Sequence, residues 1–166
     1  MPTSLQPGDD APSFALTDQS GTVRRLEDYK GKNIVLYFYP GDETPGCTTE
    51  ACEFRDEHSA LTAMGAVVLG ISRDDEASHK AFAEHHELPF PLLVDSDGAV
   101  SEAYGVWGER ERDGVKSIGM TRTTFLIGPF GRFREVWPFV RPEGHARQVK
   151  NTLAQIEAQD AFSNPE

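Results

Sequence analysis

The two cysteines of this chain, Cys47 and Cys52, lie close together in the sequence, just after a run of strand-forming residues. Thr44 is a favourable N-cap residue, Pro45 suits the first position of a helix, and residues 47–58 have the composition of a helix. Cys47 is therefore expected in the first helical turn. There the unpaired backbone N–H groups and the positive end of the helix dipole favour a thiolate, the reactive form of cysteine. The pattern predicts a nucleophilic thiol.

The spacing of the two cysteines adds a geometric constraint. Positions five apart on an ideal helix have Cα atoms about 8.7 Å apart, whereas a disulfide requires about 4.4 to 6.8 Å. Cys47 and Cys52 therefore cannot form a disulfide while this helix is intact. The spacing predicts a switch between a helical state with a free nucleophile and a locally unfolded state with a disulfide. It also excludes a Cys-x-x-Cys disulfide reductase.

The elements around the cysteines follow from the order of strand and helix signals. Residues 33–39 are almost all β-branched or aromatic, which predicts a central strand covered on both faces. Further strands are expected at residues 14–17 and 23–26 as a hairpin, and at 66–71, 91–94, 123–127 and 132–137; helices are expected at 76–86 and 146–158, with a helical turn at 99–104. A βαβ half followed by a β-hairpin and a helix predicts an α/β, thioredoxin-like fold, with a central mixed sheet flanked by helices and an extra N-terminal hairpin. We expect one domain over residues 1–166, with a mobile tail at 162–166.

Composition excludes several classes of function. The chain has 166 residues, with 27 acidic and 16 basic side chains and a formal charge of -11. This charge argues against binding to nucleic acid or to an anionic membrane. The sequence shows neither a secretion signal nor an apolar window long enough to span a bilayer, so we expect a cytoplasmic protein. In a reducing compartment, two nearby cysteines are more often catalytic, redox-active or metal-binding than a permanent cross-link.

The residues around Cys47 resemble a known motif. Pro40-x-x-x-Thr44-x-x-Cys47 is similar to the active-site motif of the peroxiredoxins, and residues 37–56 resemble the Q-type subfamily, also called bacterioferritin comigratory protein. The similarity extends to residues 70–74, 78–80, 95–98, 104–109 and 122–127, and covers nearly the whole chain from Gly8 to the final helix. Two departures are Gly41, where the subfamily commonly has lysine, and Gly128, where its turn usually begins with aspartate.

The resemblance implies a thiol peroxidase that acts on hydrogen peroxide and organic hydroperoxides. Cys47 would be the peroxidatic cysteine, oxidised to a sulfenic acid, and Cys52 the resolving cysteine, which would form an intramolecular disulfide. Arg122 and Thr44 would support the thiolate and the bound peroxide, and Pro40 would shape the pocket and shield the sulfur. Thioredoxin or a glutaredoxin-like protein would reduce the disulfide. The resemblance implies no metal, haem or flavin, and a monomer would be sufficient for the cycle.

Other interpretations stay open at this point. The same fold would also suit a dithiol-disulfide oxidoreductase or redox sensor, and the cysteines of a non-catalytic interaction module would simply pack in its core. The motif that contains Pro40, Thr44 and Cys47 argues against both. Glu50 could orient Arg122, but a role in complementing the helix dipole is the default expectation. None of the five histidines forms a closely spaced ligand set with the cysteines, so structural or surface roles are expected for His58, His79, His85, His86 and His145.

Overall fold

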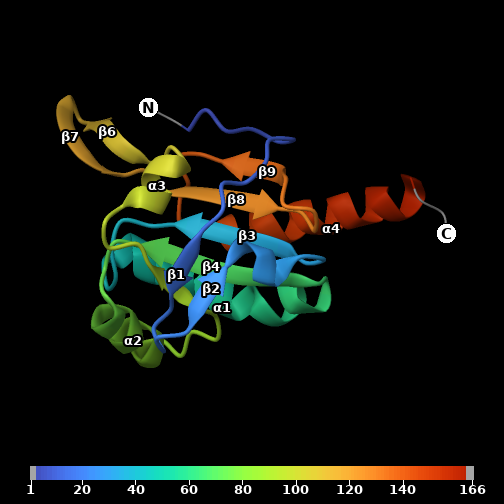
Figure 1. Cartoon of the computed structure of the whole chain (residues 1–166), viewed down its shortest axis with the longest axis horizontal. Helices are drawn as coiled ribbons and strands as arrows, with labels where there is room; N and C mark the ends of the chain where they lie inside the picture. The colour runs from blue at the N-terminus through green and yellow to red at the C-terminus, as the bar shows by residue number, and fades with distance from the viewer. Residues whose placement is uncertain (1–2, 164–166) are drawn as a thin grey trace.

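The computed structural model describes residues 3–163 and centres on a five-stranded sheet with the order β5-β4-β3-β8-β9 (Figure 1). The strands are β3 (Asn33–Phe38), β4 (Ala66–Ser72), β5 (Leu92–Val94), β8 (Thr123–Ile127) and β9 (Phe133–Trp137). β3 pairs with β4 in parallel and with β8 in antiparallel orientation, so the sheet is mixed. The helices are α1 (Pro45–Ala63), α2 (Glu76–His85), α3 (Ala99–Ala103) and α4 (His145–Ser163), and a 3-10 turn spans Leu26–Tyr29.

The sheet lies between two apolar layers because side chains alternate along β3, all six residues of which are buried. Val35 and Tyr37 belong to a cluster with residues of α1 and α4, whereas Leu36 and Phe38 belong to a second cluster on the opposite face. Figure 1 shows α1 and α4 behind the sheet in this view. β3 is therefore the covered central strand that its sequence predicts, and the loop of residues 39–44 connects it to α1.

The predicted order of elements is confirmed, including the N-terminal hairpin of β1 (Ala15–Thr17) and β2 (Val23–Arg25). Two helices are longer than predicted. α1 continues to Ala63, and α4 continues to Ser163, into the segment expected to be a mobile tail. The rest of that predicted tail, residues 164–166, lies outside the described residues.

One hairpin was not predicted. β6 (Trp107–Arg112) and β7 (Val115–Met120) form a separate two-stranded sheet that projects from the body of the protein (Figure 1). The outer half of this hairpin is exposed and charged, so its sequence lacks the alternation of apolar and polar residues that marks a half-buried strand. The Asp113-Gly114 turn, with φ of 54° and 78°, was the available signal, because this dipeptide suits a tight hairpin turn.

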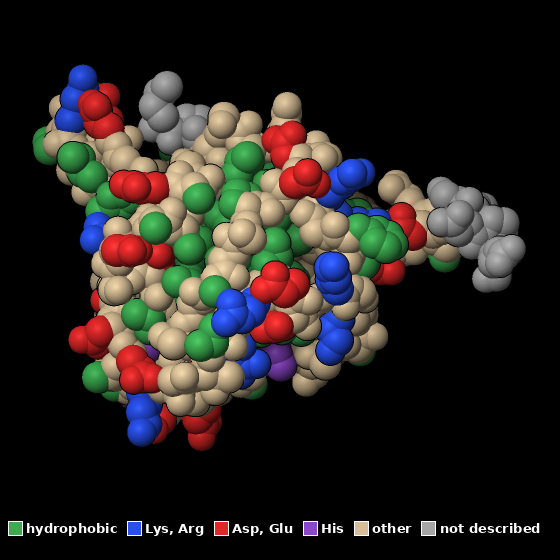
Figure 2. All heavy atoms as spheres, viewed as in Figure 1, with side chains coloured by type: hydrophobic (Ala, Val, Ile, Leu, Met, Phe, Trp, Pro, Cys, Tyr) green, Lys and Arg blue, Asp and Glu red, His purple; other side chains and the backbone are tan. Residues whose placement is uncertain are grey.

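The face of the protein seen in Figure 2 carries charges of both signs. Figure 2 shows Lys and Arg side chains scattered among Asp and Glu on the visible face, with no continuous basic patch there. Within residues 3–163, no helix has both the length and the apolar character required to cross a bilayer.

Candidate active site

Cys47 lies in the first turn of α1, as its sequence context predicts. Thr44 has the extended backbone of an N-cap residue, Pro45 follows at the first helical position, and the N–H of Thr48 donates to the Thr44 carbonyl. The Cys47 side chain is buried, with 1% of its surface exposed. Its sulfur therefore combines shielding from water with a position at the positive end of a 19-residue helix.

Arg122, at the junction between β7 and β8, places its positively charged side chain beside this sulfur. Its Nη2 donates a hydrogen bond to the Cys47 Sγ over 3.3 Å, and its Nη1 donates to the Glu50 Oε1 over 2.7 Å. The default expectation that Glu50 only complements the helix dipole is therefore wrong, because its carboxylate directly holds the guanidinium. A planar guanidinium can serve both partners at once, which a lysine ammonium would do with less geometric control.

Burial affects the protonation of both Glu50 and Arg122. Desolvation raises the pKa of Glu50 to about 7, although the nearby Arg122 charge opposes this shift. Burial also disfavours the charged form of Arg122, but Glu50 and Cys47 outweigh it, and the net effect is a raised pKa for the guanidinium. The second oxygen of Glu50, Oε2, is buried without a hydrogen-bond partner among the described residues. Arg122 thus stays cationic, while Glu50 can change its protonation state near neutral pH.

Gly46 permits the close approach of Arg122 to the helix. A Cβ at this position would lie 3.1 Å from the Arg122 Nη2 and 3.4 Å from the Cγ of Pro142. Any larger residue would therefore press on the guanidinium that contacts Cys47. This requirement was not predicted, since it depends on a contact between segments that are distant in the sequence.

The other two motif residues occupy the loop before α1. The Thr44 hydroxyl donates to the Gly41 carbonyl over 3.0 Å, so in this conformation its proton is not directed to the sulfur. The predicted N-cap position of Thr44 is confirmed, although its side chain makes no capping hydrogen bond. Pro40 is exposed and lies two residues after the end of β3. Its role in shielding the sulfur stays a prediction.

A buried network anchors the same loop to α2. The Asp42 carboxylate accepts hydrogen bonds from the Tyr39 hydroxyl at 2.6 Å and the Ser78 hydroxyl at 2.7 Å, and it lies 2.7 Å from the His79 Nδ1. The His79 Nε2 lies 2.8 Å from the Leu93 carbonyl oxygen, so both ring nitrogens are engaged. The structural role expected for His79 is confirmed, but its link to the loop before Cys47 was not predicted.

Cys52 lies on the same continuous helix as Cys47, is partly exposed, and both thiols are free. Helix geometry places their Cα atoms about 8.7 Å apart, beyond the reach of a disulfide. The structure thus corresponds to the reduced, helical member of the predicted pair of states.

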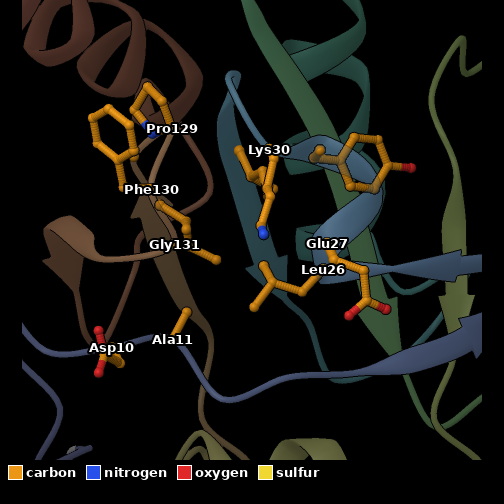
Figure 3. A pocket seen from close by; sticks show the side chains of 12 residues that line it. Asp10, Ala11, Leu26, Glu27, Lys30, Pro129, Phe130 and Gly131 are labelled. Atoms are coloured by element: carbon orange, nitrogen blue, oxygen red, sulfur yellow. The ribbon is translucent and has the colours of Figure 1, made fainter.

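A cavity of about 320 Å³ lies at the opposite end of β3 and is separate from this site (Figure 3). Its lining includes Ile34 at the start of β3 and Ile127 at the end of β8. Figure 3 shows Lys30 and Leu26 on one side of the gap and Gly131 on the other. Cys47 follows the other end of β3, so this cavity is not the peroxide site suggested by the motif.

Comparison with known proteins decides the family. The model of the AhpC/TSA family matches residues 7–136. The chain belongs to this family. It is 48% identical over 150 residues to a putative peroxiredoxin bcp from Coxiella burnetii, covering 90% of this chain and 99% of that protein. It is 44% identical over 153 residues to peroxiredoxin Bcp from Bacillus subtilis, covering 92% and 98%.

Solved structures give the same answer for this peroxiredoxin. A cysteine-to-serine mutant of PrxQ from Xylella fastidiosa superposes with a TM-score of 0.87 at 38% identity, covering 93% of this chain and 99% of that one. The bacterioferritin comigratory protein of Xanthomonas campestris superposes with a TM-score of 0.83 at 35% identity, covering 92% and 98%. The predicted thioredoxin-like fold and the Q-type resemblance are confirmed. This peroxiredoxin is therefore an enzyme of thiol-dependent peroxide reduction.

Proposed function

We propose that this peroxiredoxin reduces hydrogen peroxide and organic hydroperoxides through Cys47, with Cys52 as the resolving cysteine. The observation that carries this assignment is the hydrogen bond from Arg122 to the buried Cys47 sulfur at the start of α1. It is supported by the bacterioferritin comigratory protein of Xanthomonas campestris, which has alkyl peroxide reduction activity.

In the first step the Cys47 thiolate attacks the terminal oxygen of the peroxide. The O–O bond breaks, the sulfur becomes a sulfenic acid, and the remaining oxygen leaves as water or an alcohol after it takes a proton. Charge moves from sulfur to oxygen during this step. The Arg122 guanidinium, held by Glu50, is placed to donate to both atoms as the charge moves. Thr44 can turn its hydroxyl from the Gly41 carbonyl toward the bound peroxide, while Pro40 borders the pocket.

Resolution requires a change in α1. Cys52 can reach the sulfenic acid only if the helix between the two cysteines unwinds. The Cys52 sulfur then displaces hydroxide from the Cys47 sulfur, and a disulfide and water form. An external dithiol protein such as thioredoxin or a glutaredoxin-like protein returns both thiols by disulfide exchange. We propose that one domain, residues 1–166, completes this cycle as a cytoplasmic monomer without metal, haem or flavin.

The test is peroxide consumption with a dithiol reductant by the unsubstituted protein, Cys47→Ser and Cys52→Ser. We expect no turnover for Cys47→Ser. For Cys52→Ser we expect one round of oxidation to a sulfenic acid that a dimedone-type reagent traps. Full activity of Cys47→Ser would overturn the mechanism. Cysteine oxidation without peroxide turnover in the unsubstituted protein would instead indicate a redox sensor of the same fold.

A further inference from the structure

Three ligand-type side chains meet on the surface beside the loop that precedes α1. Glu43 lies in this loop, and His85 and His86 lie at the C-terminal end of α2. One carboxylate oxygen of Glu43 lies 2.8 Å from the His85 Nδ1, and the other lies 2.7 Å from the His86 Nε2. The three donor atoms all lie within 4.8 Å of one another. The fold thus assembles a two-histidine, one-carboxylate cluster that contains no cysteine.

We propose that Glu43, His85 and His86 bind a divalent transition-metal ion such as Zn²⁺, with water completing the coordination. Imidazole nitrogen and carboxylate oxygen are common ligands of Zn²⁺, with bonds of about 2.0 to 2.2 Å. Tetrahedral coordination at these lengths places ligand atoms about 3.3 Å apart. The two present contacts use different oxygens of Glu43. An ion bound by one of these oxygens would widen that contact by about half an ångström, while the other ligand distances, all within 4.8 Å, would have to shorten.

The exposure of two of the three side chains suits this adjustment. The side chains of Glu43 and His85 are 48% and 65% exposed, so both can move into water at little cost, whereas His86 is only 17% exposed. The Arg55 Nη1 donates to the His86 carbonyl over 2.8 Å, which fixes the backbone on the α2 side. One ligand is thus held firmly, and two can close around an ion.

The backbone of Glu43 also distinguishes this position. Its φ is 60°, in the left-handed region where a residue with a side chain costs roughly 1 kcal/mol more than glycine. A glutamate in this conformation nevertheless brings its carboxylate to both histidines.

A second cluster of potential metal ligands is less suited to binding an ion. Donor atoms of Asp42, Asp74 and His79 also lie within 4.8 Å of one another. However, Asp42 and His79 are committed to the buried network described above, and the Asp74 Oδ2 accepts from the Asp42 N–H and the Ser72 hydroxyl. A metal there would have to displace several buried hydrogen bonds, each costly to lose. The Glu43, His85 and His86 site loses only two surface contacts.

The test is isothermal titration of ZnCl₂ into the Cys47→Ser/Cys52→Ser protein, because both thiols would otherwise bind zinc. We expect one ion per chain. Glu43→Gln, His85→Ala and His86→Ala should each weaken binding by at least about tenfold, while His58→Ala, which removes a histidine outside the cluster, should bind like the parent. Zinc should also raise the unfolding temperature of the parent more than that of Glu43→Gln.

An independent readout is the electron paramagnetic resonance spectrum of Cu²⁺ added to the same cysteine-free protein. Nitrogen coupling from two imidazoles is expected, and from one imidazole in His85→Ala. Failure of the cysteine-free protein to bind zinc would overturn the proposal. Zinc binding that survives all three ligand substitutions would overturn it as well.

Discussion

The Arg122 Nη2 donates to the Cys47 sulfur over 3.3 Å, although the two residues are 75 positions apart in the sequence. This contact joins the start of α1 to the junction of β7 and β8. It gives the buried sulfur a fixed positive partner whose charge does not depend on pH in the working range.

Removal of Arg122 should slow oxidation of Cys47. Arg122→Ala deletes the donor to the sulfur and to the departing oxygen, so we expect the second-order rate constant for hydrogen peroxide to fall about a hundredfold or more. Arg122→Lys keeps the charge without the planar fork, and an intermediate rate is expected. Stopped-flow measurement of thiol loss gives both values. An unchanged rate for Arg122→Ala would reduce this residue to a structural role.

Gly46 should matter for rate and hardly for stability. In Gly46→Ala the new methyl group presses on the Arg122 guanidinium, and we expect peroxide oxidation to slow by about tenfold. Alanine favours a helix, so the free energy of unfolding should not fall. The matched control is Gly41→Ala, whose Cβ would meet its neighbours at 3.7 Å or more and should leave the rate unchanged. Equal rates for both variants would show that the guanidinium shifts freely.

Glu50 should make stability depend on pH. Its pKa is about 7 in the folded protein against 4.5 as the ordinary value, so between these values the folded state binds a proton that the unfolded state has lost. Stability from this group is therefore greatest below about pH 4.5 and falls as pH rises toward 7, by up to about 3 kcal/mol. Urea unfolding of the parent and Glu50→Gln across this range measures the difference. Parallel curves for the two proteins would contradict the raised pKa.

The Asp42–His79 pair should stabilise the loop before α1 most strongly in mildly acidic solution. Burial opposes the charge on each side chain, but their mutual contact outweighs it, lowering the pKa of Asp42 from 3.8 and raising that of His79 from 6.5. The ionised Asp42 carboxylate contributes to the free energy of unfolding above pH 3.8. This contribution is lost as the pH falls through the lowered pKa of Asp42. The His79 contribution is present below pH 6.5 and lost as pH rises through its raised pKa.

Asp42→Ala should therefore destabilise the protein by about 3 kcal/mol between these two pH values, and by less on either side. Asp56→Ala removes a carboxylate paired with Arg55 at the surface and should cost about 1 kcal/mol or less. Urea unfolding at several pH values compares the two. An Asp42→Ala effect as small as that of Asp56→Ala would show that the buried pair does not stabilise the loop.

The sequence was sufficient for features that depend on local periodicity. The buried β3, the start of α1 at Pro45 and the incompatibility of Cys47 and Cys52 with a disulfide in one helix all follow from residue type and spacing. The fold class followed from the order of these elements. Each of these inferences needs only neighbours within a few positions.

Contacts between residues that are distant in the sequence were harder to predict. The Glu50–Arg122 pair joins residues 72 positions apart, and its assignment was uncertain from the sequence because a helix dipole explains an early glutamate equally well. The meeting of Glu43 with His85 depends on how one loop packs against the end of α2. The β6–β7 hairpin was missed because its exposed strands carry no buried face to create a pattern.

The most direct test of the central claim is hydrogen exchange and mass spectrometry of the protein before and after one equivalent of hydrogen peroxide. We predict that the oxidised protein loses two hydrogen atoms, that its peptides are joined between Cys47 and Cys52, and that amide protection falls between these residues. Cys47→Ser should show none of these changes. An oxidised protein that keeps this segment protected as in the reduced helix, or that lacks the Cys47–Cys52 linkage, would contradict the account.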